Sequence, residues 1–389
     1  MTHRHCQVQD KTIASAKSPQ QLDATTTTTM KVRALCFTLL PFAIAALWTF
    51  HVYLISARHS PSGVSPKDLD VPEQRYELAD KPENVSFSPL KILCHATTQV
   101  EDPYREEDLL PVAMDIFQKR GVVLFTFIND AYLEFAFSWL CNTEAMADVH
   151  QHVLFVVTDL RSGRCLQKLW PDVSVVALNA SRYSGDQTYS QAGYVRVMVE
   201  RTRYILRLLE SGVRLLLFEV DCVWLTNALP HLLNRKPDAD IIATKVKNRT
   251  AGGFLLLSPT QRTLGLWREL TSQMDRLYEQ LEHKRYSYVI SWRLNDQEFL
   301  AALIEKRFGG IEVVHLPSQL FPDGNWYRKP AQKRIAKPLP IIINNNFIKG
   351  NAKKKKRAKS FGHWFFNTDG GGDLRALCNA SAVHAVVYS

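Results

Sequence analysis

A run of twenty-three residues without one charged side chain lies near the N-terminus of the chain. Residues 34–56 read ALCFTLLPFAIAALWTFHVYLIS and contain no Asp, Glu, Lys or Arg. A helix needs about 20 apolar residues to cross a bilayer, and a buried soluble helix would usually present a polar stripe. We therefore expect a transmembrane signal-anchor helix over residues 34–56. The competing interpretation is a cleaved signal peptide, which normally has a shorter apolar core closer to the N-terminus.

The charges on either side of this segment predict its orientation. Lys31 and Arg33 precede it, whereas Asp68 and Asp70 follow soon after it. The positive-inside rule then places residues 1–33 in the cytosol, as a disordered polar tail, and everything after residue 56 in the lumen. Residues 57–112 are rich in proline and are typical of a stem. Residues 113–389 are expected to form one lumenal domain, and four glycosylation sequons, at Asn84, Asn179, Asn248 and Asn379, agree with this topology.

The net charge of +10 is concentrated in two places. The tail supplies +3, and residues 353–359 (KKKKRAK) supply +6. Taken alone, the second cluster is typical of a nucleic-acid patch or a nuclear localisation signal. The membrane segment argues against nuclear import, so we expect no nucleic-acid partner. The remaining interpretation from charge alone is a solvated basic loop.

Strand-like and helix-like segments alternate through the predicted lumenal domain. Apolar runs typical of buried strands cover residues 121–128, 153–157, 172–178 and 213–218, with further short strands at 241–244, 253–257, 311–314 and 341–343. Helical spacing covers residues 131–147, 191–211, 260–281 and 295–307. This alternation predicts an α/β fold with a mainly parallel, doubly wound sheet. Ligands of such sheets bind beyond the carboxyl ends of strands.

Two acidic residues follow the fourth of these strands. Glu219 and Asp221 stand within the apolar run LLLFEVDCVWL, and residues i and i+2 of an extended chain point to the same side. Adjacent carboxylates repel each other unless a cation lies between them, and Mg²⁺ commonly links a few carboxylates to substrate phosphates. A polar loop after a buried strand is the alternative. Neither a GxGxxG motif nor a P-loop is present, which disfavours a dinucleotide enzyme or a P-loop kinase.

Several blocks of residues 121–366, in order, resemble the nucleotide-diphospho-sugar transferase family (glycosyltransferase family 77). Thr126–Tyr132 is similar to the family's first strand and nucleotide turn, Arg201 to its basic residue ahead of the acidic motif, and Phe218–Leu225 to its DVDVVWL signature. Further similar blocks are Gly252–Phe254 with Ser258–Thr260, Asn295–Gln297, Leu316–Pro317 with Phe321–Gly324, and Asn344–Gly350 followed by Lys353, Lys354 and Trp364.

This resemblance implies a GT-A (Rossmann-like) fold, a nucleotide-diphosphate sugar as donor, with UDP as the nucleotide, and transfer of galactose, xylose or arabinose with retention of configuration. It implies a Golgi type II membrane enzyme that acts on a glycan or glycoprotein. The implied ligands of a Mn²⁺ or Mg²⁺ ion are Glu219, Asp221 and Asn344. The implied donor-binding residues are Thr126, Asn129, Arg201, Asn346, Lys353 and Lys354, and the implied catalytic residues are Asp296 and Gln297.

The chain departs from the family pattern at three of these positions. Glu219 replaces the first Asp, Asn344 replaces a metal-binding His, and Ala251 replaces an Asn. A catalytically silent lumenal binding or scaffold protein on the same fold is therefore the alternative function.

Individual residues also have alternative interpretations. Asn295 or Asp296 can cap a helix, Arg201 can be one more solvated charge, and Trp224 is expected in the core. Cys222 is expected to be a buried free thiol.

Overall fold

The computed structural model describes residues 102–236, 238–367 and 377–387. The predicted cytosolic tail, the 34–56 membrane helix and most of the predicted stem lie outside these residues. Within the described ranges, no helix combines the length and apolar character needed to cross a bilayer.

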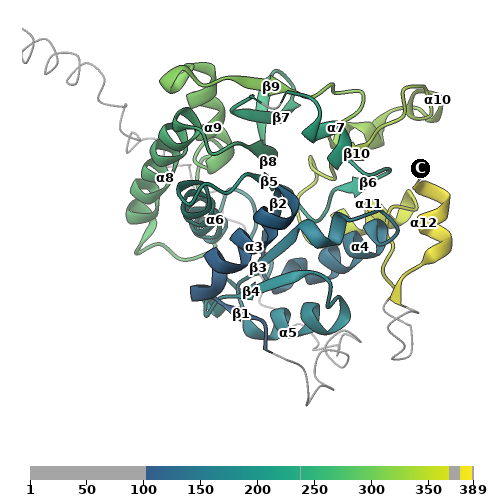
Figure 1. Cartoon of the computed structure of the whole chain (residues 1–389), viewed down its shortest axis with the longest axis horizontal. Coiled ribbons are helices and arrows are strands. Elements are labelled where there is room, and N and C mark those ends of the chain that lie inside the picture. The colour runs from purple at the N-terminus through teal and green to yellow at the C-terminus, as the bar shows by residue number, and fades with distance from the viewer. Residues whose placement is uncertain (1–101, 237, 368–376, 388–389) are drawn as a thin grey trace, which may run out of the picture. The chain divides into compact units, whose positions relative to one another are not determined.

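An eight-stranded sheet forms the centre of the described residues, in the order β1-β4-β3-β2-β5-β8-β7-β9 (Figure 1). Strand β8 is antiparallel to both neighbours, and every other neighbouring pair is parallel. The mainly parallel α/β prediction is therefore confirmed. The strands are β1 (Tyr104–Arg105), β2 (Val123–Ile128), β3 (Val153–Val157), β4 (Ser174–Ala177), β5 (Leu215–Leu217), β7 (Ile241–Val246), β8 (Arg249–Leu257) and β9 (Val313–His315).

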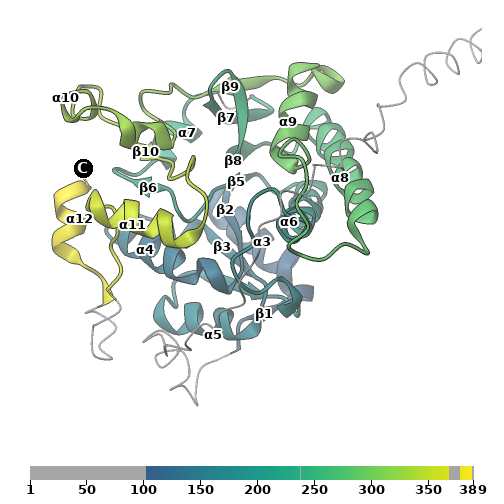
Figure 2. The same ribbon diagram turned by 180° about the vertical axis from the view of Figure 1, so that it is seen from behind.

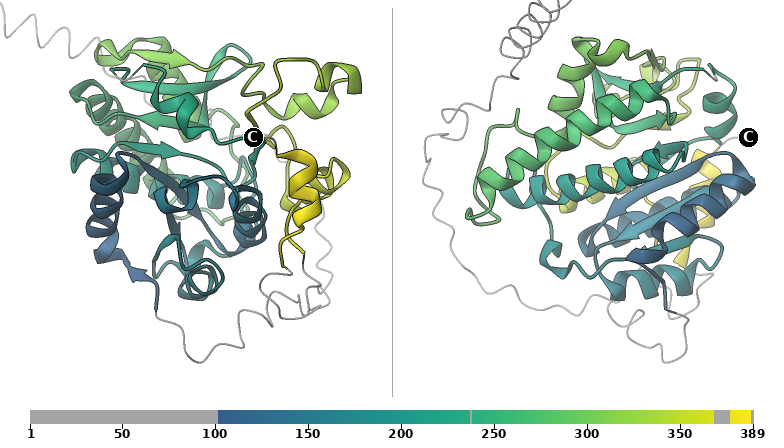
Figure 3. Two further views of the ribbon diagram at one scale, coloured as in Figure 1. Left: turned by 45° about the vertical axis from the view of Figure 1, so that its right-hand side comes forward. Right: turned by 60° about the vertical axis from the view of Figure 1, so that its left-hand side comes forward.

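Helices cover both faces of this sheet (Figure 3). Along β2, Leu124 and Ile128 point into one core with residues of α4 and α5, whereas Phe127 stacks on Tyr204 of α6 at 5.8 Å on the other face. Burial on both faces explains why the strand is a continuous apolar run. The helices are α3 (Leu109–Arg120), α4 (Leu133–Thr143), α5 (Leu160–Leu169), α6 (Ala192–Glu210), α7 (Leu229–Leu233), α8 (Gln261–Leu281), α9 (Asp296–Glu305), α10 (Ala331–Arg334), α11 (Asn351–Ser360) and α12 (Ala380–Val386).

A small second sheet lies where the acidic motif leaves the main one. Strand β6 (Val223–Trp224) pairs antiparallel with β10 (Ile342–Ile343), so that the residues after β10 lie beside the residues before β6. Trp224 is fully buried, which confirms its core position, and the Asn142 side chain holds its backbone with two hydrogen bonds of 2.8 Å. Helices α4 and α11 lie next to this second sheet (Figure 2).

The structure shows the state of three cysteines, Cys222, Cys141 and Cys378. Cys222 is a buried free thiol, as predicted, and burial holds the pKa of this thiol well above its usual value. A disulfide joins Cys141 of α4 to Cys378, just before α12, so α12 is fastened to the α4 side of the domain.

Two predicted segments differ in the structure. The last residues of the predicted 57–112 stem belong to the fold, because β1 pairs with β4 and α3 begins at Leu109; the domain therefore begins before residue 113. The basic run 353–359 lies within helix α11 rather than in a loop. Gly350, with φ 85°, precedes α11 and permits the sharp change of direction into it.

Candidate active site

The acidic motif forms a tight turn at the carboxyl end of β5. The Phe218 amide donates to the Phe125 carbonyl at 3.1 Å, and the Cys222 amide donates to the Glu219 carbonyl at 3.0 Å. The turn lines a pocket of about 80 Å³ together with residues from β2, α6 and α11. Six of the predicted site residues line this one pocket: Thr126, Asn129, Arg201, Glu219, Asp221 and Lys354.

Asp221 is paired with a lysine from the far end of the chain. Its Oδ2 accepts a hydrogen bond from Lys354 Nζ at 2.7 Å, and the Asp221 side chain is almost entirely buried. Burial opposes the charge of Lys354, but Asp221, Tyr132 and Glu219 outweigh it and hold the pKa of the ammonium well above its usual value. Asp221 Oδ1 is buried without a hydrogen-bond partner in the described structure. Lys354 is therefore charged, and Asp221 retains one free oxygen.

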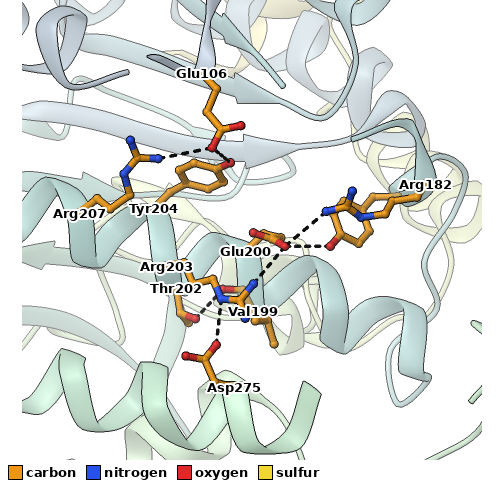
Figure 4. A network of polar contacts seen from close by, with 10 residues as sticks. Glu106, Arg182, Val199, Glu200, Thr202, Arg203, Tyr204, Arg207 and Asp275 are labelled. Atoms are coloured by element: carbon orange, nitrogen blue, oxygen red, sulfur yellow. Dashed lines mark hydrogen bonds and ion pairs between the residues drawn. The ribbon is translucent and has the colours of Figure 1, made fainter. Parts of the chain in front are cut away.

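Arg201 supplies the second positive charge of the pocket. It reaches Asp296 Oδ2 at 2.5 Å and Glu219 Oε1 at 3.9 Å, and its side chain is 7% exposed. The neighbouring arginines of α6 behave differently: Arg203 and Arg207 are about two-fifths exposed and join a surface network with Asp275 and Glu106 (Figure 4). Arg201 therefore lies on a buried face of α6, whereas Arg203 and Arg207 lie on a face that reaches solvent.

Glu219 lies between the two cations of the pocket. Its carboxyl group lies against Gly253 of β8, where a Cβ atom would clash with it. The side chain keeps 38% of its surface exposed. Even so, desolvation within the pocket and the charge of Asp221 raise the pKa of Glu219, whereas Lys354 and Arg201 lower it. The glycine is thus required by the close approach of an acid.

Helix α9 brings the predicted catalytic pair to this region. Asn295, not Asp296, is the N-cap, because its side chain accepts from the Glu298 amide at 3.0 Å. Asp296 is therefore free to pair with Arg201, and it is 5% exposed. Gln297 Oε1 accepts from the Gly252 amide at 3.2 Å, which holds α9 against β8.

The nucleotide turn after β2 is fixed from a distant loop. Asn129 donates through Nδ2 to the carbonyls of Tyr183 and Gly185, at 2.7 Å each, while its Oδ1 is buried without a partner among the described residues. Thr126, earlier on β2, is 1% exposed. Asn129 therefore closes the turn and also offers a free acceptor.

The remaining predicted residues lie next to the pocket or away from it. Asn344 and Asn346 line a neighbouring cavity with Cys222, and Asn344 Oδ1 is buried without a partner in the described part of the chain. Asn346 Oδ1 accepts from the Gly324 amide at 2.7 Å. Lys353 is exposed and does not line the pocket, so of the two candidate lysines only Lys354 reaches it.

Three carboxylates face two cations in and beside this pocket. Glu219, Asp221 and Asp296 carry the negative charge, and Arg201 and Lys354 the positive. One negative charge is thus in excess when all five are ionised, so an anionic ligand such as a diphosphate needs a further cation to bind here. Among the described residues, no group of three or more His, Cys, Asp and Glu side chains forms a ready-made metal site.

Comparison with known proteins shows the family of the chain. A model of nucleotide-diphospho-sugar transferases matches residues 148–358, more than half of the chain. The chain belongs to the nucleotide-diphospho-sugar transferase family. The matched region includes Arg201, the acidic turn and Lys354, which line the pocket, as well as α9 and the segment after β10 beside it.

Similar proteins include two plant transferases. A UDP-D-xylose:L-fucose alpha-1,3-D-xylosyltransferase of Arabidopsis thaliana, MGP4, is 26% identical over 274 residues, which cover 66% of this chain and 73% of that protein. The beta-arabinofuranosyltransferase RAY1 of the same plant is 23% identical over 286 residues, covering 68% and 51%. Among solved structures, the glycosyltransferase GlyE of Streptococcus pneumoniae has a TM-score of 0.39 at 13% identity and covers 68% of this chain and 65% of that one.

Sequence reasoning about this transferase missed several pocket residues. Tyr194 and Gln187 line the pocket, and neither belongs to a recognisable motif. Tyr194 stands seven residues before Arg201 on α6, a spacing that returns to the same helix face. That spacing is a signal from which Tyr194 could have been found. Gln187 lies in a loop without periodicity, so only the tertiary structure reveals it.

Proposed function

We propose that this protein is an active glycosyltransferase that moves a sugar from a UDP-sugar to a hydroxyl group of a glycan or glycoprotein, with retention of configuration. The observation that carries the proposal is the meeting of Asp221, Glu219, Arg201 and Lys354 in one pocket at the carboxyl ends of the strands. Its relatives are named as transferases of xylose and arabinose, so the donor sugar is of the xylose, arabinose or galactose class.

The residues present fit a hard divalent ion. Two buried oxygens without partners in the described structure, Asp221 Oδ1 and Asn344 Oδ1, come from the two chain segments that β6 and β10 bring together. With Glu219 they form an all-oxygen donor set, which suits Mg²⁺ or Mn²⁺. We propose that these three residues hold the ion, which when bound neutralises the charge of the donor diphosphate and of the departing nucleotide.

In this proposal Lys354 also helps to neutralise the negative charge of the donor phosphates. Lys354 is charged and buried, and donor binding can transfer its ammonium from Asp221 to a phosphate oxygen. The pocket of about 80 Å³ is far below the roughly 300–1,000 Å³ typical of small-molecule sites. In this proposal the Lys354–Asp221 pair, which lines the pocket, parts when the nucleotide sugar enters. Asn129 offers its free Oδ1 to the nucleotide near Thr126, whereas Asn346 lines the neighbouring cavity with Asn344.

The two residues at the start of α9 have different tasks in this proposal. Asp296 is buried against Arg201, so it positions Arg201 instead of touching the substrate. Gln297 is more accessible and lies beside Gly252, where its amide orients the transferred sugar and the acceptor hydroxyl. Ala251 leaves that side of the site without the amide that the family pattern carries.

The test is a donor screen on the full-length protein. UDP-xylose, UDP-arabinose, UDP-galactose and other nucleotide sugars are each added with and without Mn²⁺, and thermal stabilisation and donor hydrolysis are measured. We expect one donor to stabilise the protein and to be hydrolysed slowly. Absence of both effects with every donor would refute the enzyme and leave the catalytically silent binding protein.

Variants test the site assignment. Asp221→Asn should lower the rate with the active donor by about 10²–10³-fold, the effect of removing one electrostatic contributor to a transition state. Asp238→Asn is the matched control, since Asp238 is exposed and away from the pocket. Equal activity of the two variants would contradict the assignment of Asp221.

We also propose that residues 34–56 anchor the protein in the Golgi membrane with residues after 56 in the lumen. Protease protection of a C-terminally tagged full-length protein in intact vesicles is the expected result. A nuclear signal by microscopy would contradict this topology and would favour the nucleic-acid interpretation of residues 353–359.

A further inference from the structure

A second concentration of positive charge lies outside the donor pocket. From Gly324 to Thr368 the sequence contains no Asp or Glu, and residues 328–337 alone contain five basic residues. These five, Arg328, Lys329, Lys333, Arg334 and Lys337, line one hollow of about 610 Å³ together with Trp326. We call it the α10 hollow, after the helix on its wall. Figures 1 and 2 show α10 at the margin of the domain, beyond β10.

The cations of the α10 hollow have no acidic partner. None of the five forms an ion pair within the described ranges, and all but Arg334 are exposed. Arg328 and Arg334 bond instead to neutral groups: Arg328 to the Asn325 side chain at 3.3 Å and Arg334 to the Lys329 carbonyl at 3.0 Å. Like charges gathered on one concave surface repel each other. An anionic ligand would relieve that repulsion.

Trp326, in the lining of the hollow, belongs to an aromatic cluster. Trp326 packs against His363 at 5.7 Å and against Tyr327 at 5.3 Å between ring centres, and the Arg334 guanidinium lies 5.6 Å from its ring. The half-buried Trp326 adds apolar surface to the lining of the hollow, and the arginines around it can bind sulfate or carboxylate groups with two hydrogen bonds each. This combination suits a sugar chain that carries acidic groups.

The hollow is joined to the candidate active site by the segment after β10. The Gly324 amide donates to Asn346 Oδ1 at 2.7 Å, and Arg328 reaches the Phe347 carbonyl at 3.5 Å. On the other side of the same segment, Arg357 of α11 donates to the Asn346 carbonyl at 2.6 Å. The segment after β10 therefore connects the lining of the hollow with the cavity beside the donor pocket, which Asn344 and Asn346 line, and an acceptor subsite must lie near the donor.

We propose that the α10 hollow is an acceptor subsite for an acidic glycan, which binds the 328–337 cations through sulfate or carboxylate groups. The inference rests on the proposed function, because it assigns the acceptor class of that same enzyme. A membrane surface is the less suitable occupant, because the cations line a concavity of about 610 Å³ that a planar headgroup layer does not fill. The volume lies within the roughly 300–1,000 Å³ range of ligand sites.

The experiment measures glycan binding by calorimetry to the full-length protein at low ionic strength. The probes are a heparin-derived hexasaccharide, which carries sulfate and carboxylate, a hyaluronan-derived hexasaccharide, which carries carboxylate alone, and neutral xylohexaose. We expect at least one acidic probe to bind at least about tenfold more tightly than xylohexaose, and its affinity to fall with added salt. The stronger acidic probe identifies the anionic group. Equal affinity for all three, or no binding of either acidic probe, would overturn the proposal.

A variant locates the site. The triple change Lys329→Glu, Lys333→Glu and Lys337→Glu should weaken binding of the acidic probe at least about tenfold. The matched control, Lys119→Glu, Lys284→Glu and Lys306→Glu, alters the net charge equally at exposed positions elsewhere and should bind as the parent does. Equal loss in both variants would show a general charge effect and refute the subsite.

Two further arms separate other outcomes. Phosphatidylserine vesicles and a duplex DNA are tested with the same two variants, and tighter binding of either than of the acidic hexasaccharides would overturn the proposal in favour of a lipid or nucleic-acid surface. UDP binding is measured in parallel on the triple variant. If the triple variant loses hexasaccharide binding and keeps UDP binding, the subsite is supported. Absence of UDP binding in the parent protein would contradict the proposed function and would not count against glycan binding in the hollow.

Discussion

The basic residues of α11 and those of the α10 hollow lie on either side of the segment after β10, and their electrostatic states are opposite. In α11, Lys354 pairs with Asp221 and Lys355 with Glu134, so the run most conspicuous in the sequence has part of its charge neutralised internally. The five cations of the hollow have no acidic partner in the described structure. The comparison teaches that charge density along a chain does not measure the charge available to a ligand, because folding decides which cations are paired.

The largest expected effect comes from removing a paired cation. Arg201→Met leaves the buried Asp296 without its countercharge and removes one of the two cations near Glu219, and it should lower the free energy of unfolding by about 3–5 kcal/mol. Arg203→Met, two positions along the same helix, breaks two partly exposed pairs, with Glu200 and Asp275, and should cost no more than about 1 kcal/mol. Urea denaturation of both variants checks this contrast. Partial recovery is expected in Arg201→Met with Asp296→Asn, and equal costs of the two single variants would show that the Arg201 cluster is not a buried unit.

The second effect concerns His363, which lies between the two regions. Burial, and then the charge of Arg334 in the hollow, lower the pKa of His363 to about 4, against about 6.5 in an unfolded chain. Between pH 6.5 and 4 the unfolded state binds more protons, so the free energy of unfolding falls as pH falls through this window, by about 3 kcal/mol from this residue. Denaturation of His363→Gln at several pH values should show a shallower slope.

His150 contributes in the same direction, because burial lowers its pKa to about 4 as well. Burial also lowers the pKa values of His152 and His315, so His363→Gln should remove part of the slope and not all of it. His283→Gln, at an exposed position, is the control and should keep the parent slope. An unchanged slope in His363→Gln would mean that this histidine is not held neutral by the fold.

The third effect is the coupling of Lys354 with Asp221. In a double-mutant cycle of Lys354→Met and Asp221→Asn, the two changes should be non-additive by about 1–3 kcal/mol, since each single change strands a buried partner. Lys353→Met in place of Lys354→Met should show no coupling with Asp221→Asn. If Lys353 and Lys354 behave alike, the register of α11 against the acidic turn is different from that described.

The smallest effect is expected in the hollow. Lys329→Glu, Lys333→Glu and Lys337→Glu together break no ion pair, so each should change the free energy of unfolding by less than about 0.5 kcal/mol. Urea denaturation of the triple variant checks this, and the expected sign is a slight stabilisation as mutual repulsion is relieved. A loss of several kcal/mol in the free energy of unfolding would show that these lysines stabilise the fold. They would then not differ from the paired lysines of α11.

Much of the fold could be predicted because buried parallel strands leave a strong local signal. The apolar runs that become β2, β3 and β5, and the polar residues at their ends, stand out in the sequence without any knowledge of packing. The sequence could not predict which side chains of a helix face the pocket. Six cations in seven residues leave the register ambiguous, and only the docking of α11 selects Lys354 over Lys353. The α10 hollow was missed for a related reason, since its five cations are spread over short helical turns and the loops between them, with no repeating period.

The sequence by itself determined most of the strands, the acidic turn after β5 and the family whose motifs surround it. Only the tertiary structure decided which charges neutralise one another. Lys354 and Asp221 are 133 residues apart in the chain, and Arg201 and Asp296 are 95 apart. Local patterns report burial and periodicity, which depend on near neighbours, whereas an ion pair depends on two side chains meeting in space. The sequence therefore gives the charged residues, and the packing of the folded chain decides which of them are paired and which are available to a ligand.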